Sequence, residues 1–508
     1  MRLILFFLFI LSFTMNNAQE LVEREWTAEL QISISGIERT QNGDIYASST
    51  IYSINPDTAA AIAMKFNSDL ELQWSRQLRV FNDDDLGTVK VLSDGDILFG
   101  GGLGTFSSPL LGASLFKLDA NGNVLWAKAY PGSDDDRISQ IFELANGDLL
   151  LANRRGVSGE PTFFLHTDSD GSILDQFILE YEDQPLKPTS MFYDGTTFYA
   201  ASRVLNDAFQ GVLLLTALNL EEVIWSKTLD PGQDIAGGVI YPKPDGGFTV
   251  RAQVVDPGSA FSGLDVWLFE TDATGNPAWS KRLFRPNNGF SEWSSGLIRL
   301  PGGDMLFSCR FQTELGLTPV ISRFNDQGDL TWIRKSLGSS MAYQTQLNDE
   351  LVLMAGPSVN GGVGLSTSTT DGLTACGTSE IDVEIADLSI STTEVEVVFG
   401  ESDIEEGVPE YSEIGFSFEM DDLCTATLSL LDAERSHFRI YPNPATARCY
   451  IEGLDKISVL GIRDISGRIL ISQTISNTNP VVDLKSLSPG IYLITIDGVF
   501  AGRLLLEQ

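Results

Sequence analysis

Histidine is nearly absent from this 508-residue chain, which contains only His166 and His437. A multi-histidine metal site and a Ser-His-Asp triad are therefore not expected. The sequence also lacks a P-loop, a G-x-S-x-G nucleophile turn and an H-E-x-x-H helix. These absences argue against the common sequence-recognisable classes of enzyme.

Basic residues are also scarce, with 33 Lys and Arg against 69 Asp and Glu, for a formal net charge of −36. Such a surface repels nucleic acid and anionic membranes and gains nothing from counterion release. Cations, glycans and basic partners remain compatible with it. A charge of this size also serves simply to keep a protein soluble.

Long apolar runs are confined to the first residues, where MRLILFFLFILSFTMNNAQE has an early Arg, an apolar core and a small-residue exit at Ala18. This pattern predicts a secretory signal peptide at residues 1–18. A membrane anchor is the weaker alternative, because a spanning helix needs about 20 apolar residues. The sequence predicts an exported protein without stable membrane insertion.

Cysteine occurs only four times, at Cys309, Cys376, Cys424 and Cys449. Cys376 and Cys424 flank one segment that would meet an oxidising compartment, so we expect them to form a disulfide. Cys309 and Cys449 lie in strand-like patterns of different units and are expected to be buried thiols.

What the chain has in abundance is a repeat. An apolar run followed by Asp-x-x-Gly-x-x-x-Trp recurs about every fifty residues, most clearly in LFKLDANGNVLWAK, LFETDATGNPAWSK and ISRFNDQGDLTWIR, the last with Asn325 in place of the Asp. Asp175 takes the Trp position in one copy, and Trp26 opens the series. Repeats of this length with an all-β pattern predict a seven-bladed β-propeller over residues 19–376.

Each unit also contains a turn followed by a strong apolar strand, and in most units the turn is Asn-Gly or Asp-Gly, as in NGDLLLAN and DGDILFGG. Such turns favour tight hairpins, which gives four strands per unit. Because the chain starts with the Trp26 strand and the last unit ends at its third strand, the first strand is predicted to complete the last blade. The alternative is that residues after Leu373 supply that strand.

The recurring tryptophans invite a functional interpretation such as glycan stacking. A large aromatic side chain at one blade position is more often a packing layer between neighbouring sheets. The Asp-x-x-Gly segments are likewise turn chemistry first.

Units such as WAKAYPGSDDDRISQIFELANGDLLLANRR followed by FFLHTDSDG resemble the secreted propeller repeats common in Bacteroidetes. The resemblance covers about residues 21–376 and implies a fold but no ligand. LFKLDANGNVLW also resembles the quinoprotein propeller repeat. It matches the sialidase Asp-box poorly, since that box has one residue fewer between its Gly and Trp.

The C-terminal region, about residues 437–508, resembles the type A C-terminal sorting domain of the type IX secretion system. The resemblance rests on FRIYPNPATARCYIEG, VLGIRDISGRIL and VVDLKSLSPGIYLITIDG, although the last strand is poorer in lysine than is usual. It implies a small β-sandwich that directs export through that machinery, after which the protein is secreted or held at the outer cell surface. An immunoglobulin-type adhesion module is the alternative. The matching residues are Tyr441, Pro442, Asn443, Pro444, Gly467, Gly490 and Tyr492.

Between these parts, residues 377–436 are predicted to form an acidic β-rich spacer that carries the Cys376–Cys424 bridge. From Gly377 to Leu423 there are fifteen acidic residues and no basic residue, yet the alternation in IDVEIADLSISTTEVEVV is typical of strands. Acidic oxygens suit Ca²⁺, but no EF-hand loop is present.

Several loops that leave the Trp strands are acidic, and in a propeller they lie on one face together with the longer loops. That face is predicted to bind a ligand or a cation such as Ca²⁺, and solvated turns without a partner are the alternative. The predicted residues are Asp83, Asp84, Asp85, Asp134, Asp135, Asp136, Asp230 and Asp234.

The sequence therefore predicts an exported, non-catalytic propeller that binds a glycan, a peptide or a cell-surface component and needs no resident cofactor. The alternative is an enzyme, either a carboxylate-based polysaccharide-active propeller or a quinoprotein-like dehydrogenase. The dehydrogenase is disfavoured because such enzymes often carry an adjacent Cys pair, which is missing here.

Overall fold

The computed structural model consists of strands and turns, and the residues that it describes contain no helix. The predicted all-β class is confirmed. The chain divides into a large unit, Leu21–Ala426, and a smaller one that contains Thr427–Gln508. The described residues are 19–27, 31–52, 59–79, 85–103, 112–131, 136–154, 162–255, 264–284, 296–313, 316–336, 343–346, 351–357, 363–374, 378–381, 383–402, 404, 406–407, 409, 411–415, 419–428, 439–443, 445–452, 458–463, 469–476, 481–485, 487–488, 490–496 and 499–506.

The large unit is built from groups of four antiparallel strands, numbered here as sheets in chain order. The first three are sheet 1 with β2 (Gln31–Arg39), β3 (Ile45–Tyr52), β4 (Ala59–Phe66) and β5 (Leu72–Arg79), sheet 2 with β6 (Asp85–Val91), β7 (Ile97–Leu103), β8 (Gly112–Leu118) and β9 (Val124–Pro131), and sheet 3 with β10 (Arg137–Glu143), β11 (Leu149–Arg154), β12 (Phe163–Thr167) and β13 (Ile173–Tyr181). One pairing between β10 and β7 joins sheets 2 and 3.

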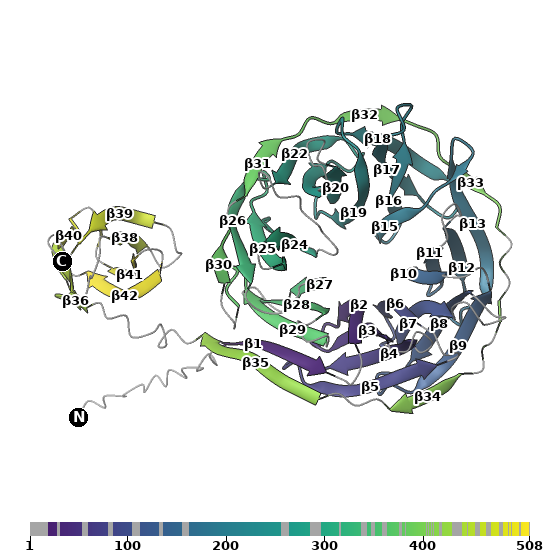
Figure 1. The fold of residues 1–508 in the computed structure, drawn as a ribbon, viewed down its shortest axis with the longest axis horizontal. Coiled ribbons are helices and arrows are strands. Elements are labelled where there is room, and N and C mark those ends of the chain that lie inside the picture. The colour runs from purple at the N-terminus through teal and green to yellow at the C-terminus, as the bar shows by residue number, and fades with distance from the viewer. Residues whose placement is uncertain are drawn as a thin grey trace, which may run out of the picture. The chain divides into compact units, whose positions relative to one another are not determined.

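The remaining groups repeat this pattern. They are sheet 4 with β15 (Pro188–Tyr193), β16 (Phe198–Leu205), β17 (Gly211–Leu218) and β18 (Val223–Asp230), sheet 5 with β19 (Ile235–Pro242), β20 (Phe248–Val255), β21 (Leu264–Thr271) and β22 (Pro277–Phe284), sheet 6 with β23 (Leu297–Arg299), β24 (Met305–Thr313), β25 (Gly316–Phe324) and β26 (Leu330–Ser336), and sheet 7 with β27 (Tyr343–Gln346), β28 (Leu351–Pro357), β29 (Val363–Thr369) and β1 (Gln19–Thr27). The sheets follow one another around a ring, with the first strand of each innermost (Figure 1).

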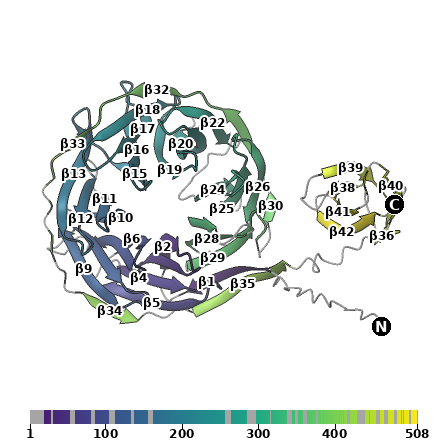
Figure 2. The ribbon, with the colours of Figure 1, turned by 180° about the vertical axis from the view of Figure 1, so that it is seen from behind.

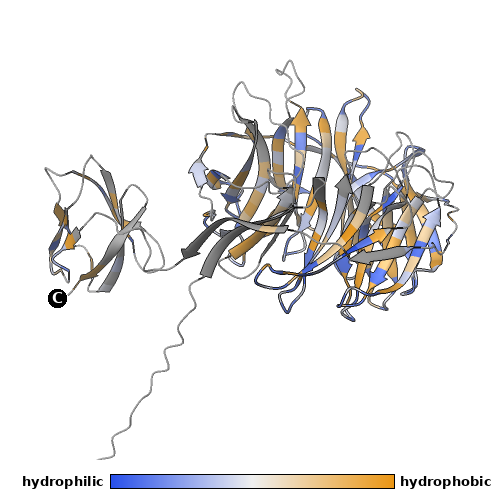
Figure 3. Cartoon of the chain, turned by 60° about the horizontal axis from the view of Figure 1, so that its bottom comes forward, coloured by the Kyte–Doolittle hydropathy of each residue, from blue (hydrophilic) through white to orange (hydrophobic). Residues whose placement is uncertain are grey.

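The apolar cores lie between neighbouring sheets. Val250 and Phe269 of sheet 5 share one core with Leu213 and Leu215 of sheet 4. A middle strand therefore has a neighbour on both faces, and all of β17 is buried. Apolar residues accordingly gather on the strands and polar residues at the turns (Figure 3).

The N-terminal strand completes the last sheet, as the phase of the repeat predicts. β1 pairs antiparallel with β29, from Glu23 opposite Ser366 to Trp26 opposite Val363. Sheet 7 also shares a core with sheet 1, through Leu353 and Leu365 packed with Phe66. The two ends of the repeat region are therefore joined.

The tryptophans of the repeat pack against turns, as predicted. Five of them, Trp74, Trp126, Trp225, Trp279 and Trp332, lie against the turn glycine of the following sheet. A Cβ on Gly122 would lie 2.9 Å from Trp74 Cδ2, and one on Gly275 would lie 2.8 Å from Trp225 Cη2. Where Asp175 replaces the tryptophan, the turn of the next sheet, Asn219 to Glu222, has no glycine. The glycine thus provides room for the ring as well as the turn geometry.

A methyl group at this glycine should be costly. Gly328→Ala would place a Cβ 2.5 Å from Trp279 Cε3 and would also strain a positive φ of 78°. Gly147→Ala meets the same strain, with φ 89°, but nothing lies within 4 Å. We expect Gly147→Ala to lower the free energy of unfolding by about 1–2 kcal/mol and Gly328→Ala by about 1–3 kcal/mol more, measured by urea unfolding. Equal losses would contradict the packing role.

Residues 378–428, here called the belt, run back around the large unit and add an outer strand to almost every sheet (Figure 2). The sequence instead predicts a separate spacer for residues 377–436. The difference arises because the outermost strand of each sheet leaves an unpaired backbone edge, which the belt satisfies. The belt strands are β30 (Thr378–Glu380) on β26, β31 (Glu384–Asp387) on β22, β32 (Ser391–Glu394) on β18, β33 (Val398–Gly400) on β13, β34 (Ser412–Gly415) on β5 and β35 (Glu419–Leu428) on β1.

The belt's acidity matches the lysine that stands two residues after the tryptophan in sheets 2, 4 and 5. Lys281 Nζ lies 2.7 Å from Asp387 Oδ1, and Lys128 Nζ lies 3.4 Å from Glu406 Oε1. In the described part of the chain, the belt meets sheet 2 at one bridge, Ala129 opposite Gly407. Exposed pairs of this kind contribute only about 0–1 kcal/mol each, so the backbone bonds between the strands hold the belt in place.

The predicted disulfide remains a prediction, since Cys376 lies outside the described residues. Cys424 lies in β35, next to β1 in sheet 7. A bridge between these two cysteines would close the belt into a covalent loop. Cys309 and Cys449 are buried thiols, as predicted.

The smaller unit has two sheets on one core, as the predicted β-sandwich requires. Ile451 and Val482 of one sheet share the core with Leu460, Ile494 and Leu504 of the other. The sheets are β36 (Arg439–Tyr441), β37 (Arg448–Glu452) and β40 (Val481–Asp483), and β39 (Ile469–Ile475), β38 (Ser458–Arg463), β41 (Gly490–Ile496) and β42 (Val499–Leu506).

The predicted sorting residues have structural roles in this unit. Asn443 Oδ1 accepts a bond from Leu505 N at 2.9 Å, which ties the first motif to the last strand. Tyr492 is buried and donates its hydroxyl to the Ser488 carbonyl, and Tyr441 stacks on Tyr450. Gly490 begins β41 and Pro442 follows β36, whereas Pro444 and Gly467 lie outside the described residues.

Candidate functional site

The acidic residues predicted to form a binding face are only partly within the described chain, which excludes Asp83, Asp84, Asp134 and Asp135. Asp85 begins β6, and Asp136 is buried rather than displayed. No group of three or more His, Cys, Asp or Glu side chains suited to a metal ion occurs among the residues that the structure describes. A calcium site on this face therefore stays a prediction.

Asp230 and Asp234, the last two predicted residues, are engaged by their own chain. Asp230 accepts bonds from Asn206 Nδ2 at 3.2 Å and from Gly232 N at 2.7 Å. Asp234 Oδ1 accepts bonds from Arg203 Nη2 at 2.9 Å and from Gly211 N at 2.6 Å. Both carboxylates stabilise loops around β16 and β17.

A different site emerges from a charge pattern that recurs around the ring. The third-strand residue opposite the tryptophan, or opposite Asp175 in sheet 3, is a Lys, Arg or His that meets an acid of the first hairpin turn. This pattern holds in sheets 1, 2, 3 and 6. The distances are 2.9 Å for Lys65 to Asp44, 3.1 Å for Lys117 to Asp94, 3.2 Å for His166 to Asp148 and 2.8 Å for Arg323 to Asp304.

Sheet 5 inverts this pattern. The register places Glu270 opposite Trp279, where Lys117 stands opposite Trp126 in sheet 2. The base now comes from the turn, since Lys243 Nζ lies 3.0 Å from Glu270 Oε2. Sheet 4 also lacks the base, because Ala217 stands opposite Trp225, but sheet 5 exchanges the two charges. This exchange is a reason to look for function there.

Glu270 is only 3 % exposed, and its charge is matched by several donors. Arg299, from the first strand of sheet 6, forms an ion pair with Glu270 Oε1 and donates to Thr249 Oγ1 at 2.7 Å. Its Nη1 donates to the Gly303 carbonyl at 2.7 Å. A buried carboxylate needs such partners, and this ionic network joins sheets 5 and 6.

Lys243 is held in its charged form. Burial alone would lower its pKa, but the bonds to Glu270 and to Asp245, 3.2 Å away, outweigh burial and raise the pKa above its usual value. Asp245 is partly desolvated, yet bonds from Gly247 N and Lys243 lower its pKa. Both groups are therefore ionised at neutral pH.

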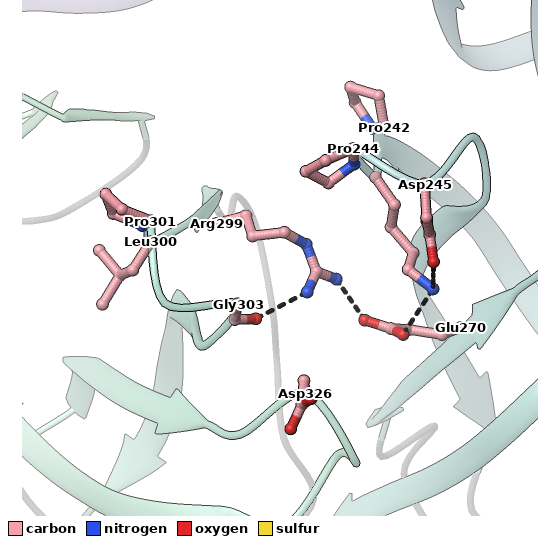
Figure 4. Close-up of a pocket in the computed structure, with 10 residues that line it drawn as sticks. Pro242, Pro244, Asp245, Glu270, Arg299, Leu300, Pro301, Gly303 and Asp326 are labelled. Carbon is pink, nitrogen blue, oxygen red and sulfur yellow. Dashed lines mark hydrogen bonds and ion pairs between the residues drawn. The ribbon is translucent and has the colours of Figure 1, made fainter.

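This network borders a cavity of about 730 Å³. Pro242 and Pro244 lie on one side and Leu300 and Pro301 on the other, with the ionic network between them (Figure 4). Asp326, beside Gly303, is exposed, and no described residue bonds to its carboxylate. The cavity thus combines rigid apolar walls, charged groups fixed in position and an available acceptor, as ligand sites do.

Sequence reasoning missed this cavity, although a signal was present. The third-strand segment reads LFKLD in sheet 2 and LFETD in sheet 5, and the preceding turn reads YPKPDGG. The exchange of Lys for Glu is visible, but Arg299 comes from the next repeat. Only the packing of sheet 5 against sheet 6 brings the two together.

The most specific comparison concerns the smaller unit. Residues 439–499 match the family model described as the secretion system C-terminal sorting domain. The protein is exported. It is secreted or attached to the outer surface, and the sorting domain indicates interaction with type IX secretion machinery. Among the described residues, no helix is long and apolar enough to cross a membrane.

No curated protein matches the chain, and the similar solved structures are distant. A protein of unknown function from Dyadobacter fermentans is 11% identical, covering 69% of this chain and 99% of its own, with a TM-score of 0.40. An ulvan lyase of a polysaccharide lyase family is 10% identical over 71% and 97%, with a TM-score of 0.46. An α-L-arabinofuranosidase from Fusarium graminearum is 9% identical over 70% and 99%, with a TM-score of 0.42. Such distant likenesses do not inform the function.

Proposed function

We propose that this protein is an exported, non-catalytic seven-bladed β-propeller of the Bacteroidetes type that binds a glycan in the cavity between sheets 5 and 6. The propeller is supported by the recurring four-stranded sheets, by the cores between neighbours and by the pairing of β1 with β29. Export by the type IX route is supported by the sorting domain. The observation that carries the binding role is the charge inversion at Glu270.

A neutral, hydroxyl-rich ligand suits the chemistry of the cavity. Lys243 and Arg299 are balanced by Glu270 and Asp245, so a neutral ligand meets donors and acceptors without leaving a charge unpaired. Asp326 adds an uncompensated acceptor, which disfavours anionic ligands, as does the net charge of −36. Proline rings offer rigid apolar faces at little entropic cost.

Asp326→Asn should weaken glycan binding without changing the fold. Losing a charge-assisted hydrogen bond corresponds to about a tenfold loss of affinity. Asp170→Asn is the matched control, because Asp170 is an exposed acid in the corresponding turn of sheet 3, away from the cavity. A glycan array identifies the ligand, and calorimetry then compares the two variants.

A reducing-sugar release assay on the same glycans tests the enzymatic alternative. The proposal predicts binding without release. Absence of glycan binding, or equal binding by both variants, would contradict the cavity assignment. Sugar release that is lost in Glu270→Gln would instead show a polysaccharide-active enzyme.

A further inference from the structure

Phe209 occupies a position that neither packing nor turn chemistry explains. It lies in the turn between β16 and β17, where Phe209 N donates to the Asn206 carbonyl at 2.9 Å. Its φ is 58°, a conformation that glycine adopts in most turns of this kind, and its side chain is 83% exposed. Leu70 has a similar φ of 60°, but its side chain is buried in the core. Burial compensates the strain at Leu70, and no such compensation exists at Phe209.

The turn that presents Phe209 is held firmly. Asn206 Oδ1 accepts bonds from Ala208 N and Gln210 N, both at 3.0 Å. Asp230 bonds to Asn206 from one side, and Asp234 secures the start of β17 through Gly211. Two of the predicted acidic residues therefore act as supports for this aromatic tip, which reduces the entropy lost when a partner binds.

A second strained turn lies beside it. β13 is followed by a two-residue hairpin to β14 (Gln184–Pro185), in which Glu182 and Asp183 both have positive φ, 52° and 56°. Tyr181, which begins this hairpin, packs against the apolar core that contains Val204 of β16 and Val212 of β17, the two strands that the Phe209 turn joins. Of the four non-glycine residues with positive φ in the described chain, three are therefore found here.

Strain of this kind persists where function requires it. The Phe209 surface, defined as Tyr181–Gln184 with Leu205–Gln210, combines an exposed aromatic ring, an exposed Leu205 and three exposed carboxylates. We propose that the Phe209 surface is a docking site for a protein segment rich in arginine or lysine. The ring takes a cation on its face, and Glu182, Asp183 and Asp207 bind the remaining charges. The net charge of −36 speeds the approach of such a partner.

The probe is a fluorescein-labelled peptide with four arginines spaced by glycine and serine, followed by anisotropy in about 0.15 M salt, close to physiological ionic strength. Phe209→Gly should weaken binding about tenfold, since the cation–π and apolar contacts are lost. The same variant should keep or raise the melting temperature, because glycine relieves the positive φ. Leu70→Gly, at a similar φ but in the core, should lower the melting temperature and leave binding unchanged.

Charge is controlled separately. Glu182→Gln, Asp183→Asn and Asp207→Asn combined should weaken binding about tenfold. The control neutralises Glu384, Glu396 and Glu401, exposed acids of the belt, and changes the net charge equally. Binding within twofold of wild type in Phe209→Gly, equal losses in both charge variants, or no peptide binding up to about 1 mM, the weak end of the affinity scale, would overturn the proposal. If Phe209→Gly instead abolished binding of a glycan, the partner of this surface would be a glycan and the proposal of a basic protein segment would be wrong.

Discussion

Deleting residues 19–31 should abolish the folded ring. Since β1 is paired with β29 and also lies next to β35, its loss exposes two backbone edges in the middle of sheet 7. The junction between sheet 7 and sheet 1 would also lose support. We expect the loss to approach the whole stability of a typical domain, about 5–15 kcal/mol. Thermal unfolding and limited proteolysis of the purified protein measure it.

A shorter deletion provides the control. Removing only Gln19–Val22 leaves the four registered pairs from Glu23 to Trp26 with β29 in place, so a much smaller loss is expected. A synthetic peptide of residues 19–31, added to the longer deletion, should bind as the missing strand and restore the melting temperature. If the protein that lacks residues 19–31 unfolded at the same temperature as the intact protein, the first strand would be dispensable.

The sequence could predict this junction because it depends on counting. Each repeat signals its strands by turn residues and by alternation, and an incomplete last unit with an extra first strand favours their pairing over the alternative in which residues after Leu373 supply the strand. The packing role of the tryptophans was predictable in the same way. The glycine partner of each tryptophan could not be predicted, because it lies in the next repeat, as Gly328 does for Trp279. The only hint is that the repeat with Asp175 in place of the tryptophan is followed by a turn, Asn219 to Glu222, that has no glycine.

The path of the belt could not be predicted. Its alternation correctly indicates strands, but a strand in an acidic segment does not name the edge that it will pair with. The ion pairs of Lys281 with Asp387 and of Lys128 with Glu406 can be recognised only in the folded structure. The amino-acid sequence does not show which strand edge is left unpaired for another segment. For this reason a spacer was the expected arrangement.

The candidate sites show the same division. The acidic loops are visible as composition, yet Asp230 and Asp234 serve as supports for a turn. The cavity needs Glu270 and Arg299 from different repeats, and Phe209 is recognisable only from its backbone angle and exposure. In both cases we infer function at a position where one repeat differs from the others. Such a difference is visible only when the structures of the repeats are compared.

The second large effect concerns export. A chain that ends at Ser436 lacks the sorting domain, so it should remain inside a host that has type IX machinery, whereas the full-length protein reaches the surface or the medium. The belt and β1 are retained in this truncation, and the large unit has its own cores. The melting temperature of the ring should therefore not change. Fractionation with immunoblotting measures export, and unfolding of the purified truncation checks the fold.

A point variant separates the sorting signal from the mere presence of the domain. Asn443→Ala removes the acceptor for Leu505 N, which ties the first motif of the domain to its last strand. The loss of one hydrogen bond costs about 0.5–1.5 kcal/mol, so a partial defect in export is expected, with the ring intact. Conversely, residues 429–508 fused to a periplasmic reporter should carry it out of the cell. Normal export of the truncated chain would instead mean that the signal resides in the ring.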